Sequence, residues 1–162
     1  MIVDAYTHIL PAGYQALLEE KITDRDMSLN SARYAQSIPT LVDLEARFRL
    51  MDDFGEYIQV VSVASPPVHS IAPPAVAAEL CRAANDELAE MVLKYPQRFA
   101  AGIATLPMND MDAALKEAQR AIKDLRLRAV ELYTDINGQP LDAPQFMPLY
   151  EMMADLDRPI FI

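Results

Sequence analysis

Apolar residues recur along this chain in two patterns. Five short runs are almost wholly apolar, which is typical of strands buried on both faces of a parallel sheet. Four longer segments carry apolar residues three and four positions apart, which is typical of amphipathic helices that cover such a sheet. The predicted strands span residues 2–6, 57–64, 99–105, 128–134 and 159–162, and the predicted helices span 41–54, 75–95, 111–125 and 144–156.

The segment 41–54 carries the clearest end signals of the predicted helices. Thr40 is a candidate N-cap with Asp43 three residues on, and Gly55 lies just past the helix end. The apolar face of this helix is predicted to contain Leu41, Leu44, Phe48 and Met51.

The predicted strands and helices alternate along the chain, which is the pattern of βα units around a parallel sheet. Residues 10–40 make the first connection a long βα loop, with a short helix around 12–20. Long βα loops carry functional sites in such folds. The length suits a single domain over residues 1–162. Two architectures fit this pattern, an open doubly wound sheet and about half of an eight-stranded barrel.

Composition narrows the classes of function. The chain has 14 Lys and Arg residues against 24 Asp and Glu residues, a formal net charge of -10. Such a field repels phosphate backbones and anionic lipids, so we expect neither nucleic-acid nor membrane binding. The single cysteine, Cys81, has no partner for an internal disulfide, and no signal-peptide pattern or bilayer-length apolar run is present. We therefore expect a cytoplasmic protein.

Four blocks of the sequence resemble the N-terminal half of the amidohydrolase-related family, and most closely its aminocarboxymuconate-semialdehyde decarboxylase group. The blocks are VDAYTHILP, ARFRLMDDFG, NDELAEMVLKYPQRFAAGIATLPMND and LRLRAVELYTDINGQPLDAPQFMPLYEMMADLDRPIFI. The resemblance implies a metal-dependent (β/α)₈ barrel of roughly twice this length, with its active site at the C-terminal ends of the strands. The predicted fold class is therefore α/β, the N-terminal half of a TIM-type barrel with about (βα)₄β topology.

The resemblance also implies a divalent metal, most commonly zinc. In the family, the first strand usually ends in His-x-His, and both histidines bind the metal. Here His8 matches the second histidine, whereas Tyr6 replaces the first. The family's next histidine follows a segment like the final PIFI, and its catalytic base and metal-binding aspartate come later still. We therefore expect this chain by itself to be incomplete and inactive.

Strand alternation puts Tyr6 and His8 on one side of the first strand, as it does Ile2 and Asp4. One histidine does not make a catalytic zinc site, which typically keeps three protein ligands. Three roles are open to Tyr6: metal ligand, hydrogen-bond partner of a substrate or water, or filler of the space that a lost ligand leaves. A histidine with no ligand role is the alternative for His8.

Three further residues are candidates for the site or its support. Alternation turns Glu131 toward the barrel interior, where it would meet a polar group or an arginine; a rim position is the alternative. Arg33 lies in the long first loop, where the resembled decarboxylase has a substrate-binding arginine, and its guanidinium suits a carboxylate. Arg47 fits a structural or surface role. His69, after the second strand, is either solvated or in contact with substrate.

The leading hypothesis is a metal-dependent enzyme that decarboxylates or hydrolyses a small carboxylate substrate, with Tyr6, Arg33 and Glu131 binding the substrate and His8 binding the metal. The alternative is a non-catalytic half-barrel that binds a partner or forms a homo-oligomer. Its exposed sheet edges would pair with a second copy and bury apolar surface.

Overall fold

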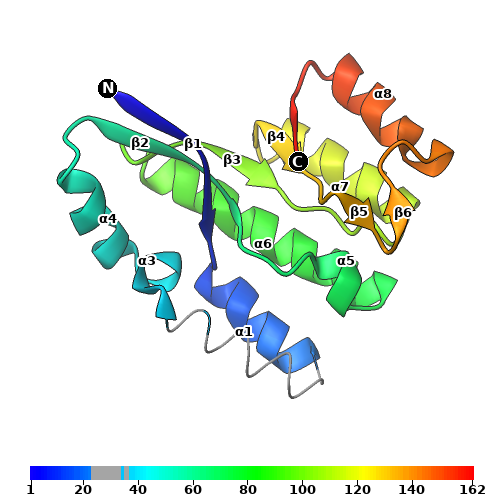
Figure 1. The fold of residues 1–162 in the computed structure, drawn as a ribbon, viewed down its shortest axis with the longest axis horizontal. Coiled ribbons are helices and arrows are strands. Elements are labelled where there is room, and N and C mark those ends of the chain that lie inside the picture. The colour runs from blue at the N-terminus through cyan, green and yellow to red at the C-terminus, as the bar shows by residue number, and fades with distance from the viewer. Residues whose placement is uncertain (23–33, 35–36) are drawn as a thin grey trace.

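A five-stranded parallel sheet forms the centre of the computed structural model, which describes residues 1–22, 34 and 37–162 (Figure 1). The sheet order is β1 (Ile2–Ile9), β2 (Tyr57–Val63), β3 (Phe99–Ala104), β4 (Ala129–Glu131) and β7 (Ile160–Phe161). Each pairing between neighbours is parallel. The order follows the chain, so each new strand adds to the same side of the sheet.

Helices fill the connections between the strands. They are α1 (Ala12–Lys21), α3 (Pro39–Val42), α4 (Leu44–Asp52), α5 (Val68–Ile71), α6 (Pro74–Lys94), α7 (Met111–Lys123) and α8 (Met147–Asp155), with the 3-10 turn η1 (Pro144–Phe146) and the hairpin of β5 (Asp135–Ile136) and β6 (Gln139–Pro140) before α8. The short helix expected around 12–20 is therefore present as α1. No helix in the described ranges is long and apolar enough to cross a bilayer.

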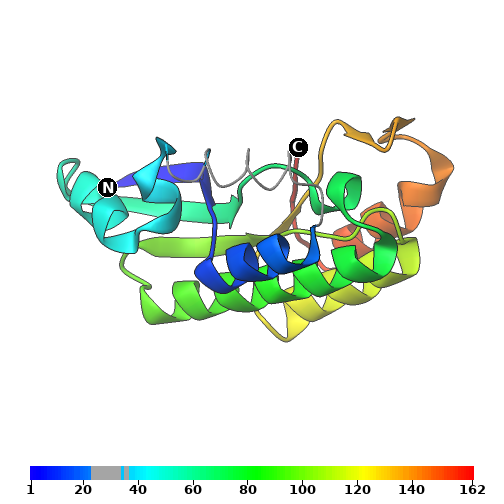
Figure 2. The ribbon, with the colours of Figure 1, turned by 90° about the horizontal axis from the view of Figure 1, so that it is seen from below.

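One face of the sheet carries the hydrophobic core. Figure 2 shows α1, α6 and α7 lying along this face. Apolar side chains at helical spacing pack against strand residues such as Val61 and Val130, which are fully buried. Helical spacing also predicts the inward faces of α6 and α7, and most of their side chains are fully buried: Ala77, Leu80, Ala84, Leu88, Ala114, Ala118 and Ala121, whereas Met91, Tyr95 and Leu125 are partly buried.

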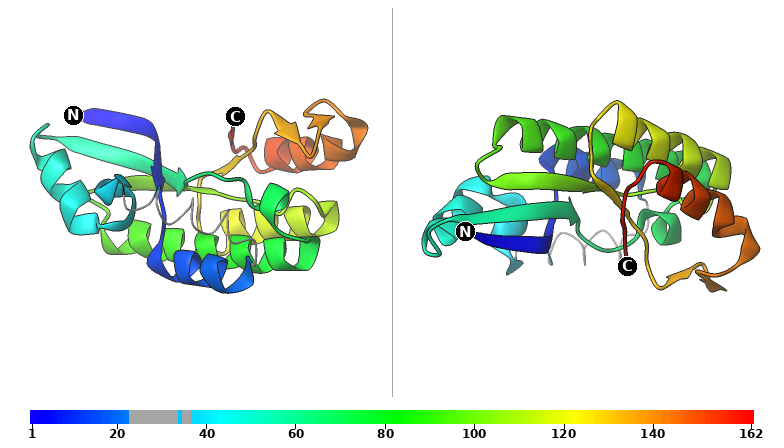
Figure 3. Two further views of the ribbon diagram at one scale, coloured as in Figure 1. Left: turned by 60° about the horizontal axis from the view of Figure 1, so that its bottom comes forward. Right: turned by 90° about the horizontal axis from the view of Figure 1, so that it is seen from above.

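The other face of the sheet is concave. Figure 3 shows β1 and the C-terminal strand β7 rising on the side away from α6, so the sheet curls around this face. A doubly wound sheet would carry helices on both faces, whereas here the main layer of helices covers the outside. The predicted α/β half-barrel is thus confirmed.

A bulge in β1 decides which side chains face the concave interior. Asp4 pairs with Gln59 and Thr7 with Val61, so three steps along β1 match two along β2. Asp4 therefore lies on the outer face with Gln59, while His8 pairs with Ser62 on the inner face. Without the bulge, strict alternation would place His8 on the same face of the sheet as Asp4.

Two local predictions were wrong. The predicted helix 41–54 is split, because Asp43 and not Thr40 caps α4, accepting hydrogen bonds from the backbone of Glu45 and Ala46 at 2.8 and 3.2 Å. The predicted strand 128–134 ends at Glu131, and the chain then turns into the β5–β6 hairpin. Gly55 follows α4 with a positive φ of 71°, as its predicted position past the helix requires.

Candidate active site on the concave face

The C-terminal ends of β1, β2, β4 and β7 bring a group of polar and aromatic side chains together on the concave face. Glu131 pairs with Phe161 across β4 and β7, and His8 pairs with Ser62 across β1 and β2. Tyr6 joins the two halves, since its ring stacks on Phe161 with centroids 5.4 Å apart and meets His8 edge-on at 4.9 Å. We call these five residues the interior cluster.

Tyr6 and Glu131 form the closest polar contact of the interior cluster. The Tyr6 hydroxyl donates to Glu131 Oε1 at 2.5 Å. Glu131 is only 4% exposed, and its burial raises the pKa of the carboxyl, although hydrogen bonds from Tyr6 and Ser62 oppose this. Burial, with the bond to Glu131, also raises the pKa of Tyr6. The pair therefore holds its protons more firmly than free side chains do.

His8 provides the only side-chain nitrogen atoms of the interior cluster, and these could bind a metal. Its Nδ1 lies 2.8 Å from Ser62 Oγ, and no hydrogen bond joins Nε2 to a described residue. Burial lowers the pKa of His8, and the positive charge of Arg47 lowers it further. The imidazole is thus favoured in its neutral form, the form that binds metals.

The described residues do not complete a metal site. Residues 1–22, 34 and 37–162 contain no group of three or more His, Cys, Asp or Glu side chains that could hold an ion. His8 and Glu131 are two candidate donors, but Glu131 is already bonded to the Tyr6 hydroxyl. Any metal would need further ligands from outside the described residues.

The structure brings most of the candidate residues into or next to this region. Tyr6, His8 and Glu131 share the interior, so the rim position for Glu131 is wrong. Arg33 lies outside the described residues. The solvated position for His69 is wrong, because it is 6% exposed in α5, with its ring centroid 6.2 Å from that of Tyr133.

Arg47 has a structural position, since it is 5% exposed and hydrogen-bonded to the backbone of His8. The surface alternative for Arg47 is wrong. Sequence reasoning missed Ser62 and Phe161. Ser62 had a usable signal, a polar residue between two valines of a mostly apolar strand, whereas no periodicity marks Phe161 as the stacking partner of Tyr6.

The family model described as amidohydrolase matches residues 3–162. The chain belongs to the amidohydrolase family. Among curated relatives, it is 34% identical to a gamma-resorcylate decarboxylase of a Polaromonas species over 158 residues, which cover 90% of this chain and 48% of the relative. It is 26% identical to the 2-amino-3-carboxymuconate-6-semialdehyde decarboxylase of Dictyostelium discoideum, over 99% of this chain and 48% of the relative. The predicted family resemblance is confirmed, and the chain spans about half the length of these relatives.

Solved structures of the family share the fold. A 5-carboxyvanillate decarboxylase from Sphingomonas paucimobilis superimposes with a TM-score of 0.84 at 27% identity, over 99% of this chain and 51% of that one. A dihydroxybenzoic acid decarboxylase from Polaromonas has a TM-score of 0.74 at 30% identity, over 99% of this chain and 48% of that one. The latter was solved with bound manganese and the inhibitor 2-nitroresorcinol. Both of these similar structures are decarboxylases, and this chain covers about half of each.

Proposed function

We propose that this chain supplies one side of the active site of a metal-dependent decarboxylase that acts on a small hydroxylated aromatic carboxylate. The observation that carries the proposal is the interior cluster, which gathers Tyr6, His8 and Glu131 where barrel enzymes place their chemistry. Three of the four relatives named above support it, since they are decarboxylases of gamma-resorcylate, dihydroxybenzoic acid and carboxyvanillate, while the fourth decarboxylates an aminocarboxymuconate semialdehyde. Residues 1–162 would form a single partial-barrel domain with the long first βα loop at about 10–40.

In this proposal His8 binds a divalent metal through Nε2. The hydrogen bond from Ser62 favours the charged form of Glu131, so the Ser62 hydroxyl acts there as the donor. The lone pairs of the Ser62 oxygen can then accept a hydrogen bond from His8 Nδ1, which would carry the proton of the imidazole. That tautomer points the Nε2 lone pair away from Ser62. A bound divalent ion would polarise the substrate and neutralise charge that develops during the loss of CO₂. Zinc stays a prediction, and the manganese in the Polaromonas relative makes that ion the first alternative.

Tyr6 and Glu131 are proposed to bind the ring of the substrate. The Tyr6–Glu131 bond is itself a contact between a phenol hydroxyl and a carboxyl, the contact that a hydroxybenzoate ring would make. The adjacent Phe161 ring offers an aromatic face. We propose that Arg33 holds the carboxylate of the substrate through a bidentate pair. We also propose that the enzyme is cytoplasmic.

The experiment uses the full-length protein that contains these residues. Bound manganese and zinc are quantified, and release of CO₂ is assayed with 2,6-dihydroxybenzoate and with an aminocarboxymuconate-like acid. We expect a bound ion and turnover of at least one acid. His8→Gln should lower both metal affinity and kcat/KM by more than about 100-fold, since even groups that only orient a ligand cost 10- to 100-fold.

His69→Gln is the matched control, because it removes the other histidine of this chain, which is buried in α5 outside the interior cluster. We expect it to retain the metal. Protein free of metal and inactive on every acid would refute the proposal. Equal effects of the two histidine variants would remove His8 from its assigned role.

The exposed edge of β1 favours a second candidate, a half-barrel that pairs with another copy. β1 is an edge strand, and its Ile2 and Val3 are each 50% exposed. Light scattering of the full-length protein tests this. A concentration-independent monomer with decarboxylase activity would exclude it, whereas an inactive dimer that Val3→Lys dissociates would favour it.

A further inference from the structure

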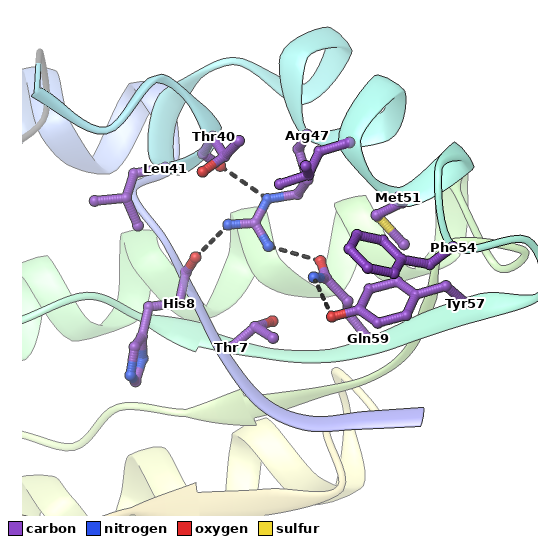
Figure 4. Close-up of a pocket in the computed structure, with 10 residues that line it drawn as sticks. Thr7, His8, Thr40, Leu41, Arg47, Met51, Phe54, Tyr57 and Gln59 are labelled. Atoms are coloured by element: carbon purple, nitrogen blue, oxygen red, sulfur yellow. Dashed lines mark hydrogen bonds between the residues drawn. The ribbon is translucent and has the colours of Figure 1, made fainter. Parts of the chain in front are cut away.

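Arg47 forms hydrogen bonds with three separate segments of the chain next to the interior cluster. Arg47 lies on α4 and is 5% exposed. Nε donates to the Thr40 carbonyl at 2.8 Å, Nη1 donates to Gln59 Oε1 at 2.7 Å, and Nη2 donates to the carbonyl of His8. Figure 4 shows these contacts converging on the guanidinium from α3, β2 and β1. One side chain thus links the end of the first strand to the connection that follows it.

The three acceptors of Arg47 are all neutral. No described carboxylate lies within ion-pair distance of it, although the Asp4 carboxylate, which accepts from the Tyr57 hydroxyl, favours its charge from further away. Burying a guanidinium is costly unless its donors are satisfied. Burial accordingly lowers the pKa of Arg47, yet an arginine stays charged in proteins. A packed apolar side chain would avoid this cost, so stability alone does not explain an arginine at this position.

The geometry at His8 shows what the arginine achieves. The carbonyl of His8 points to Arg47, while its imidazole projects from the opposite side of β1 (Figure 4). The bulge between Asp4 and Thr7 interrupts the ladder with β2 just before His8. Pairing is regular again from Thr7 to Ile9, and the Ile9 carbonyl accepts from Ala64 N at 3.0 Å. Because successive carbonyls of a strand point to opposite edges, the His8 carbonyl faces the edge of β1 away from β2, where no strand partner holds it. The bond from Arg47 constrains it from outside the barrel.

We propose that Arg47 is a positioning residue that sets the direction of the His8 imidazole by holding the His8 carbonyl. The inference rests on the proposed function only in assigning a metal to His8. Gln59 assists, because its amide oxygen accepts from Nη1, and it lies on the outer face of β2. The bond to Thr40 ties the same guanidinium to the segment that closes the first βα connection.

The test compares Arg47→Met, Arg47→Lys and Leu149→Ala in the full-length protein. Methionine keeps length and bulk without donors, and lysine keeps the charge but cannot reach all three acceptors in the same way. Leu149 is fully buried on α8, and its truncation costs about 2–5 kcal/mol, so it controls for lost stability. Unfolding by urea ranks the variants, and the other measurements are made where each is folded.

Two measurements report on His8 itself. Ring proton resonances of His8 and His69, assigned with His8→Gln and His69→Gln, are compared at one pH near 8.5, where both imidazoles are neutral. Calorimetry with manganese chloride gives the metal affinity. We expect Arg47→Met to shift or broaden the His8 resonance and not that of His69, and to weaken manganese binding about 10- to 100-fold. Arg47→Lys should recover part of the loss, and Leu149→Ala should change neither measurement.

An unchanged His8 resonance in folded Arg47→Met would overturn the inference, and so would equal shifts of both histidines. If Arg47→Met does not fold, Arg47→Lys carries the test, because lysine cannot hold all three acceptors, and the same two results would overturn the inference. Wild-type protein that binds no manganese would count against the proposed function. The resonance comparison would then still decide the role of Arg47.

Discussion

Two glutamates are almost fully buried in this half-barrel, and their surroundings differ. Glu117, on α7 among the outer helices, is 5% exposed, and Glu131, on the concave face, is 4% exposed. Glu117 accepts from Asn85 Nδ2 at 2.7 Å and from Arg120 Nη2 and Nε at 2.8 and 2.9 Å. Glu131 accepts a hydrogen bond from the Tyr6 hydroxyl and forms no ion pair with a described cation. The same side chain is thus neutralised at one site and left without a counter-charge at the other.

The partners of Glu117 show that it belongs to the framework. Asn85 also exchanges two hydrogen bonds with the backbone of Thr105, at 2.9 and 3.0 Å, and Arg120 reaches Asp86 at 2.6 Å. This network ties α6 and α7 to the end of β3. Glu131 connects only side chains that face the interior. The comparison indicates that a buried carboxylate with a full set of donors supports the fold, whereas one without a cation is available for a ligand.

The matched substitution Glu117→Gln and Glu131→Gln tests the comparison, and the first should have the largest effect. Every described partner of Glu117 is a donor, so an amide at this position must turn its NH₂ toward another N–H group. Arg120 keeps Asp86, which limits the damage. We expect Glu117→Gln to lower the free energy of unfolding by about 3 kcal/mol, measured by urea denaturation of the full-length protein.

Glu131→Gln should leave the free energy of unfolding within about 1 kcal/mol of the wild type, because an amide oxygen still accepts from Tyr6 and a hydroxyl such as Ser62 can accept from the amide. It should nevertheless weaken binding of the aromatic acid. If the two variants were equally unstable, Glu131 would be part of the framework, and the distinction between the two glutamates would fail.

The pH dependence of stability is the next test. Burial raises the pKa of Glu131, so the folded state binds its proton more tightly than the unfolded state does. The stabilisation is complete below the unfolded pKa of about 4.3 and is lost as the pH rises through the folded pKa. The free energy of unfolding of the wild type minus that of Glu131→Gln should therefore fall as the pH rises from about 4. Urea denaturation over a pH series measures the difference, and a difference that grows with pH would contradict the raised pKa.

The part of this architecture that depends on periodicity was predictable from the sequence. The inward-facing alanines of α6 and α7 are fully buried, and alternation placed Glu131 on the interior, because these positions follow from repeats of 3.6 and 2 residues. The Asn137–Gly138 pair also carried a signal that was overlooked. Both residues have positive φ, 53° and 77°, and they make the turn of the β5–β6 hairpin.

Contacts between segments distant in the sequence were not predictable in this way. The bulge in β1 depends on how β1 pairs with β2, and no pattern within residues 2–9 predicts it. The bond from Arg47 to the His8 carbonyl spans 39 positions and joins a side chain to a backbone atom, which no residue pattern reports. The replacement by Tyr6 was visible as a departure from the family motif. Its bond to Glu131 required the sheet to bring β1 and β4 to the same interior.

Tyr6→Phe separates the role of the hydroxyl from that of the ring. Phenylalanine keeps the stacking on Phe161 and the edge contact with His8 but removes the donor to Glu131. Because Tyr6 is 38% exposed, water replaces part of the bond, and we expect a loss of about 1 kcal/mol near neutral pH. The Tyr6 hydroxyl favours the charged form of Glu131, so the loss should shrink in acid, where the carboxyl is protonated. Stability curves of Tyr6→Phe and wild type that stay parallel from about pH 4 to 8 would show that the hydroxyl does not control the charge of Glu131.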